Sequence, residues 1–247
     1  MVMRILNAIT LVSLLTLFSG HVFAADVIRK ISDPNDITSY FTIWDKEHIK
    51  PAHTAEPRKR ADFGKANKSW EAQKFADWVV DSGDNNHLPF VIVDKKDAKV
   101  FVFDPDGKIV GSSAALLGIA HGDDSSPGIG TRSLREIRRK ERTTPAGRFV
   151  GTLGYNTDGK DVLWVDYDNA VSLHRVITDE PRERRLQRLA TSTPLDNRIS
   201  YGCINVPKKF YEDVIRPVFN DTSGVIYILP ETRPAGDIFE SYYDVDP

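Results

Sequence analysis

The chain has 247 residues, of which 28% are charged and 40% hydrophobic, and its formal net charge is −2. This charge is too small to indicate binding to nucleic acid or to an anionic membrane surface. The composition is that of an ordinary globular protein, and the length is sufficient for one sizeable hydrophobic core with an added subdomain.

Residues 1–24 have the three-part pattern of a secretory signal peptide. A basic start ending at Arg4 is followed by an apolar stretch, residues 5–18, and then by the small residues that a signal peptidase recognises. The apolar stretch is shorter than the roughly 20 residues of a membrane-spanning helix, so an uncleaved anchor is the weaker interpretation. We therefore expect cleavage after Ala24, a periplasmic location and no stable membrane span in the mature protein.

Residues 25–87 are predicted to form an N-terminal arm with one helix. The first part of this arm is polar, irregular and rich in proline. Ser69 is a suitable N-cap for a helix that extends to about Asp81, with its apolar side chains on one side. We assign no chemistry to this helix, because its pattern indicates packing.

From Leu88 onward, short apolar runs alternate with turns. They predict strands at residues 89–94, 99–104, 108–117, 148–155, 162–167, 170–176 and 224–229. Because the strands do not alternate regularly with helices, we expect a mainly β fold with a mostly antiparallel, sandwich-like core and a few short helices. The core domain is expected to cover residues 88–230, followed by a C-terminal tail at 231–247.

Two charged segments, residues 118–144 and 178–198, interrupt the strand pattern, and the second includes a short helix near Glu183. Long insertions in a compact β domain are often binding loops or lids, although charged runs are more often plain surface. His121 and the two aspartates that follow it closely do not have the spacing of a metal site, and we expect no metal.

Cys203 is the only cysteine of the chain. It cannot form an internal disulfide, so it is a small buried side chain, a link to another chain or a nucleophile. Gly202 leaves room for a substrate and frees backbone N–H groups to hold an oxyanion. A helix predicted soon after Pro207 would favour the thiolate.

His174 is the candidate general base. On the predicted strand, Val171 and Leu173 share one face, and Ser172 and His174 share the other. The imidazole therefore points away from the apolar side, and imidazole side chains can take a proton from a thiol near neutral pH.

Taken together, these segments resemble the signature of the YkuD-type L,D-transpeptidases. That signature is a His, a variable spacer and Ser/Thr-His-Gly-Cys-aliphatic-Asn/Arg; here His174 is followed by Ser200-Tyr201-Gly202-Cys203-Ile204-Asn205. Residues 144–149 resemble the Thr-Pro-x-Gly-Arg/Lys-Phe turn of the family, and residues 90–104 resemble its first hairpin. The similarity covers roughly residues 88–230. The sequence departs from the family in two respects. Tyr201 stands where a His is usual, and the spacer between His174 and Cys203 is longer than usual.

The resemblance implies an L,D-transpeptidase catalytic domain that acts on peptidoglycan stem peptides without any cofactor. Cys203 would attack the bond before the terminal D-Ala, and the thioester would pass its acyl group to an amine of another stem peptide or of a wall-anchored protein. His174 would be the base, oriented by a backbone carbonyl at Arg175. Residues that would hold the oxyanion or position the site are Ser200, Tyr201, Gly202 and Asn205.

Arginine side chains suit the carboxylates of stem peptides through bidentate contacts. The candidate substrate-binding residues are Arg175, Arg184, Arg185 and Arg198. Three alternatives remain open at this point: a hydrolase that uses the same acyl-enzyme, a non-catalytic peptidoglycan-binding protein, and a papain-like protease. The last is disfavoured because its cysteine would precede its histidine.

Overall fold

The computed structural model describes residues 58–246, and the predicted signal peptide and most of the predicted arm lie outside these residues. Within residues 58–246, no helix combines the length and apolar character needed to cross a membrane. The strands are β1 (Phe90–Asp94), β2 (Lys99–Phe103), β3 (Ile109–Ala114), β4 (Leu117–Gly118), β5 (Gly147–Tyr155), β6 (Asp161–Asp166), β7 (Val171–Arg175), β8 (Arg198–Ser200), β9 (Ile204–Val206) and β10 (Gly224–Ile228). The α-helices are α4 (Trp70–Ser82), α5 (Arg185–Ala190), α6 (Lys208–Phe210) and α7 (Arg216–Phe219).

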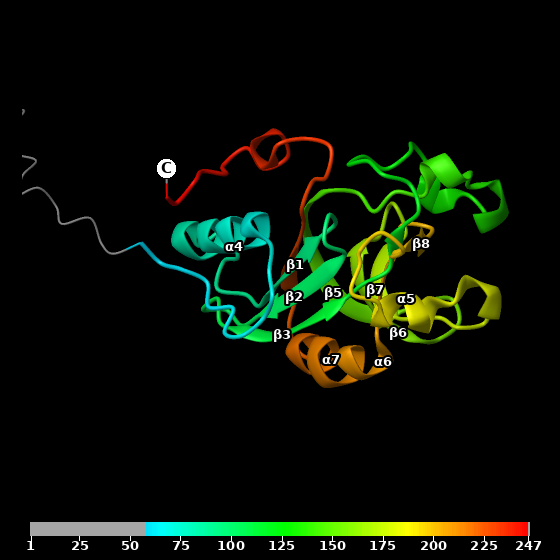
Figure 1. Cartoon of the computed structure of the whole chain (residues 1–247), viewed down its shortest axis with the longest axis horizontal. Helices are drawn as coiled ribbons and strands as arrows, with labels where there is room; N and C mark the ends of the chain where they lie inside the picture. Colours follow the sequence, from blue (N-terminus) through cyan, green and yellow to red (C-terminus); the bar gives the residue numbers. More distant parts are fainter. Residues whose placement is uncertain (1–57, 247) are drawn as a thin grey trace, which may run out of the picture. The chain divides into compact units, whose positions relative to one another are not determined.

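Eight of the strands form one mixed sheet in the order β3-β2-β1-β10-β5-β6-β7-β9, and β4 pairs with β8 separately (Figure 1). The expectation of a mainly β fold with short helices is confirmed. Two neighbouring pairs in the large sheet, β1 with β10 and β7 with β9, are parallel. The sequence did not predict these pairings, because they join strands that are far apart in the chain.

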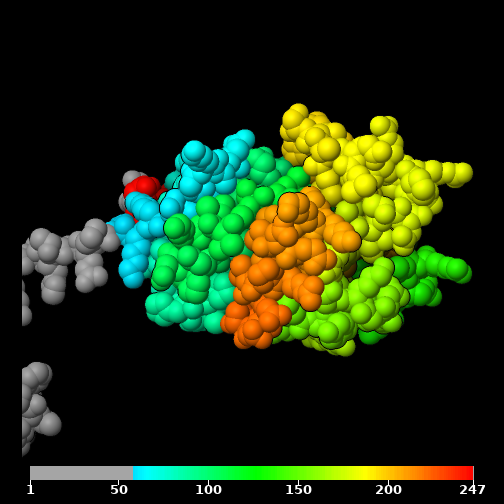
Figure 2. Space-filling model, turned by 90° about the horizontal axis from the view of Figure 1, so that it is seen from below, coloured from blue at the N-terminus to red at the C-terminus, as the bar shows by residue number. Residues whose placement is uncertain are grey.

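The central strands are buried on both faces, which explains their continuous apolar runs. On β1, Val91 and Val93 contribute to one hydrophobic cluster, whereas Phe90 and Ile92 contribute to a second cluster on the opposite face. The first cluster is covered by a continuous helix at residues 208–219, in which α6 and α7 are joined by a π-helical turn. Figure 2 shows this helix in orange next to the yellow segment that contains α5.

Helix α4 covers the second cluster. The Ser69 hydroxyl accepts a hydrogen bond from the Ala72 N–H at the start of the helix, and Gly83 ends it in the left-handed conformation. Phe75 and Trp78 pack against strand residue Tyr227. The helix predicted from Ser69 to about Asp81 is therefore confirmed.

The C-terminal tail belongs to the same folded unit. Phe239 and Val245 are buried in the cluster beneath α4, and the Trp78 indole N–H donates to the Ser241 carbonyl. Residues 58–246 belong to one compact unit. The boundaries expected at residues 87 and 230 consequently fall inside this unit, because apolar side chains from both flanking segments complete its core.

Candidate active site

The topology of the sheet brings the two candidate catalytic residues together. Cys203 directly precedes β9, and β9 lies parallel to β7 with Asn205 opposite His174. The Cys203 thiol is half-buried, and its Sγ lies 3.5 Å from the Ala170 carbonyl oxygen. The Ser172 hydroxyl donates to the same sulfur over 3.7 Å. Ser172 and His174 thus share the strand face that the sequence predicted, and this face is turned toward the thiol.

The imidazole of His174 is oriented by the backbone. Its Nδ1 lies 2.7 Å from the carbonyl oxygen of Arg175, the contact that the family resemblance implied. Because a carbonyl can only accept a hydrogen bond, Nδ1 carries the proton and Nε2 remains available as a base.

The pKa of the Cys203 thiol lies below its ordinary value. Burial raises this pKa, but the hydrogen bond and charge of His174 and the contacts with Ser172 lower it by more. The helix expected to favour the thiolate begins only at Lys208, beyond β9. The activation of the thiol therefore comes from the neighbouring strand β7.

Gly202 is required by the backbone. Its φ is +134°, a conformation that other residues rarely adopt, and a Cβ there would lie 2.8 Å from the Thr143 carbonyl oxygen. The Gly202 carbonyl accepts from the Thr144 hydroxyl at 2.8 Å, and its N–H donates to the Ser200 hydroxyl at 3.1 Å. The Gly202 N–H is thus already engaged, which leaves the N–H of Cys203 as the candidate oxyanion donor.

Two side chains hold the carbonyl group of the nucleophile itself. The Ser200 hydroxyl donates to the Cys203 oxygen at 2.6 Å, and the Asn205 amide donates to it at 3.2 Å. Both side chains are buried. Tyr201 is arranged differently, since the Arg142 guanidinium lies 3.7 Å from the centre of its ring. Such a stacked pair stabilises the ring orientation beside the nucleophile.

Three of the four arginines predicted to bind substrate make ion pairs inside the protein. Arg175 pairs with Asp161 and Glu212, and Arg198 pairs with Glu231. Arg185 contacts Glu183 and Asn205, whereas Arg184 is exposed.

Sequence reasoning did not single out Arg142, Thr144 and Ser172 as site residues. Ser172 could have been found, because strand alternation places it on the same face as His174. Thr144 is the first residue of the turn at 144–149 that resembles a turn of the family. This is a weaker indication of a site residue than strand alternation gives for Ser172. No local pattern indicates that Arg142 contacts Tyr201, because 58 residues separate them.

A buried cluster of charges lies in the loops beside the site. The Lys95 ammonium donates to Asp123 at 2.7 Å and lies 3.7 Å from Glu231, and all three side chains are almost completely buried. Asp124 pairs instead with Arg233. Within residues 58–246, no group of three or more His, Cys, Asp or Glu side chains is arranged to hold a metal ion.

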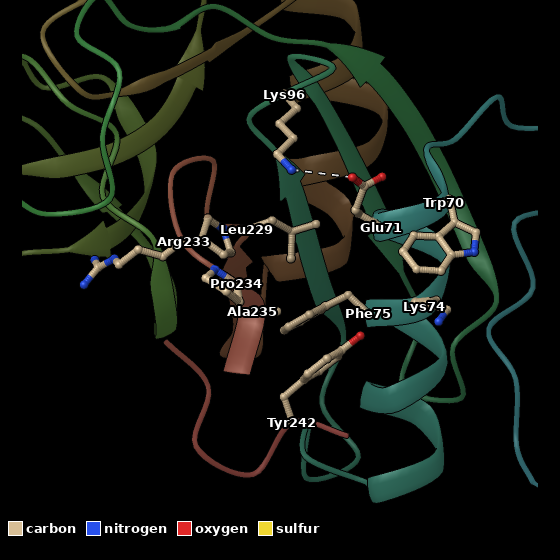
Figure 3. Close-up of a pocket in the computed structure, with 11 residues that line it drawn as sticks. Trp70, Glu71, Lys74, Phe75, Lys96, Leu229, Arg233, Pro234, Ala235 and Tyr242 are labelled. Carbon is tan, nitrogen blue, oxygen red and sulfur yellow. Dashed lines mark hydrogen bonds and ion pairs between the residues drawn. The ribbon is translucent and has the colours of Figure 1, made fainter. Parts of the chain in front are cut away.

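A pocket between α4 and the C-terminal tail is separate from the cysteine site (Figure 3). Its lining includes Trp70, Phe75, Leu229 and Tyr242, and neither Cys203 nor His174 is among its lining residues. Its lysines already have partners: Lys96 pairs with Glu71, and Lys74 pairs with Asp244. We assign no chemistry to this pocket.

No protein-family model matches the chain, and no curated protein matches it significantly in sequence. Solved structures to which it is similar are L,D-transpeptidases. The carbamoyl enzyme of Ldtfm with avibactam is 15% identical over 58% of this chain and 49% of that chain, with a TM-score of 0.32. The catalytic domain of the Enterococcus faecium enzyme is 18% identical over 57% of this chain and 96% of that chain, with a TM-score of 0.30. The L,D-transpeptidase from Stackebrandtia nassauensis is 16% identical over 60% of this chain and 57% of that chain, with a TM-score of 0.31. At these values the similarities do not establish the family of this chain.

Proposed function

We propose that this protein is a cysteine acyltransferase of the L,D-transpeptidase type that acts on peptidoglycan stem peptides. The observation that carries the proposal is the arrangement of Cys203, His174 and the Arg175 carbonyl. It combines a thiol of lowered pKa with a base whose other nitrogen is held by a fixed acceptor. The signature around these residues supports the substrate class, and the secretory-signal pattern of residues 1–24 supports a periplasmic location.

In the first step the Cys203 thiolate attacks the carbonyl carbon of the peptide bond before the terminal D-Ala. The Cys203 N–H donates to the oxyanion of the tetrahedral intermediate. The carbon–nitrogen bond then breaks, and the imidazolium of His174 gives its proton to the leaving amine. Free D-Ala and a Cys203 thioester result.

In the second step an acceptor amine attacks the thioester. His174 takes a proton from this amine, the new amide bond forms, and the Cys203 thiolate leaves. A water molecule in the position of the amine would give hydrolysis instead. Both outcomes use the same residues, so the acceptor site decides between transferase and carboxypeptidase activity.

The first prediction is that Cys203 is acylated by a carbapenem, which the family resemblance suggests as a suicide acyl donor. Intact-mass spectrometry of the wild-type protein is expected to show one adduct, and peptide mapping is expected to locate it on Cys203. Cys203→Ser is expected to show none, because its hydroxyl lacks the acidity of the thiol. A folded wild-type protein of unchanged mass, or an adduct on another residue, would contradict the proposal and favour a non-catalytic binding protein.

Incubation with a disaccharide-tetrapeptide then tests the substrate. Release of D-Ala together with a cross-linked product indicates transfer to an amine, and release with a free tripeptide indicates hydrolysis. Cys203→Ser serves as the blank in both assays.

A further inference from the structure

The insertion between His174 and Cys203 contributes a side chain that reaches the nucleophile through one intermediary. We propose that Arg185 is a positioning residue, which holds the backbone carbonyl of Cys203 in place by orienting the Asn205 amide. This inference rests on the proposed function of Cys203 as the nucleophile. It replaces the expectation that Arg185 binds a substrate carboxylate.

Asn205 is the intermediary. Its side chain is almost completely buried, and its backbone N–H and C=O both pair with Leu116, at 2.9 and 2.8 Å. The Arg185 Nη1 donates to Asn205 Oδ1 at 2.8 Å, and Asn205 Nδ2 donates to the Cys203 carbonyl oxygen at 3.2 Å. A guanidinium can only donate, so this contact requires the amide oxygen of Asn205 to face Arg185. The amide nitrogen must then face Cys203.

Arg185 is itself held in place by its own segment. Its Nε donates to a carboxylate oxygen of Glu183 at 2.5 Å, and only 13% of its side chain is exposed. The backbone carbonyl of Glu183 accepts from Arg188 at 2.7 Å. The insertion is thus folded by its own contacts and presents Arg185 to Asn205 in one orientation.

The expected consequence concerns the acylation step and not the ionisation of the thiol. Neither Arg185 nor Asn205 donates to Cys203 Sγ; the groups that lower its pKa are His174 and Ser172. Asn205, held by Arg185, acts on the Cys203 carbonyl, which belongs to the peptide group that follows the nucleophile. The Cys203 N–H, the proposed oxyanion donor, belongs to the preceding peptide group. The two groups meet at the Cys203 Cα, so holding the carbonyl restrains the backbone on which the thiol and this N–H are placed. Without Arg185 the Asn205 amide is free to rotate, and the Cys203 carbonyl loses one of its two side-chain donors.

A double-mutant cycle tests this inference. Arg185→Ala, Asn205→Ala and the double variant are compared in the rate of carbapenem adduct formation, measured by intact mass. Each single variant is expected to be roughly 5- to 10-fold slower than wild type, as for the loss of one hydrogen bond acting in the transition state. The double variant is expected to be no slower than the slower single variant, because both changes break the same chain of contacts. The pH midpoint of iodoacetamide alkylation is expected to be unchanged in all three.

The control is Gln187→Ala, an exposed change on the same helix, which is expected to match wild type. Rates that multiply in the double variant would show that Arg185 acts independently of Asn205 and would overturn the inference, as would an unaltered rate in Arg185→Ala. If Arg185→Ala does not fold, the cycle uses Arg185→Lys. A lysine ammonium cannot reproduce the planar geometry with which the guanidinium donates to Glu183 and Asn205 at the same time.

A readout that needs no acylation separates this inference from the proposed function. The ¹⁵N amide resonances of Cys203 and Ile204 are expected to shift in Arg185→Ala and Asn205→Ala but not in Gln187→Ala. If the wild-type protein is never acylated while these shifts occur, the proposed function fails and the positioning role stands. If the shifts are absent, the positioning role fails whatever the activity.

Discussion

Replacement of His174 by alanine is expected to slow acylation of Cys203, and with it D-Ala release from a tetrapeptide, by about 100-fold or more. The variant loses the group that takes the thiol proton and returns it to the leaving amine. The hydrogen bond and charge that lower the thiol pKa are lost with it. The remaining activity would come from the Cys203 N–H, which still donates to the oxyanion, and from substrate binding. Both persist when a catalytic base is removed.

The same variant has a defined effect on the pH dependence of alkylation. His174 lowers the pKa of Cys203, so removing it raises that pKa and reduces the thiolate fraction at neutral pH. The midpoint of the iodoacetamide rate against pH is therefore expected to move to higher pH in His174→Ala. An unchanged midpoint would mean that the two side chains do not interact, and would contradict the assignment of His174 as the base.

Tyr201→Phe is the matched control, since it alters a side chain two residues from the nucleophile. A phenol is almost wholly protonated at neutral pH, so it is a poor base there. The ring face of Tyr201 contacts Arg142, and phenylalanine retains that contact surface. We expect a loss of several-fold at most, as for one hydrogen bond of about 1 kcal/mol. Equal inactivity of folded Tyr201→Phe and His174→Ala would instead make Tyr201 a direct participant.

Lys95→Ala is expected to lower the free energy of unfolding by about 3–5 kcal/mol, the usual cost of removing one partner from a buried ion pair. Lys95 also donates to the backbone carbonyls of Gly122 and Thr144, so three acceptors lose their donor. Burial lowers the pKa of Lys95, opposed by its hydrogen bond with Asp123 and by the charges of Asp123 and Glu231. Urea denaturation at neutral pH measures the loss.

The neighbouring residue provides the control. Lys96 pairs with Glu71 at 3.5 Å, but both side chains are about half exposed, so Lys96→Ala is expected to cost about 0–1 kcal/mol. Equal effects of Lys95→Ala and Lys96→Ala would show that the buried cluster contributes no more than a surface pair.

Much of the fold could be predicted because its signals are local. The cap at Ser69, the alternation around His174 and the turns between neighbouring strands each lie within a few residues. The parallel pairing of β1 with β10 could not be predicted in this way. It joins Phe90 to Val225, and nothing near either residue specifies the other.

The same distinction applies to the candidate site. Cys203 and His174 are predicted as catalytic residues because one is a lone thiol after a glycine and the other lies on a strand face free of apolar side chains. The arginines were interpreted by their chemistry alone, as ligands for carboxylates. That interpretation could not include Glu231, which the fold brings against Arg198, because such a partner becomes visible only when the chain is folded.

The position of β10 also bears on how the chain folds. It is the last strand in sequence among residues 58–246, yet it lies between β1 and β5 near the centre of the large sheet (Figure 1). Until it is in place, β1 and β5 each have an unpaired edge, and such edges invite association with other chains. Joining them requires a loop closure of more than a hundred residues from β1, which slows folding. Productive folding therefore depends on nearly the whole chain being available at once, and a chain that stops before residue 224 is expected to aggregate.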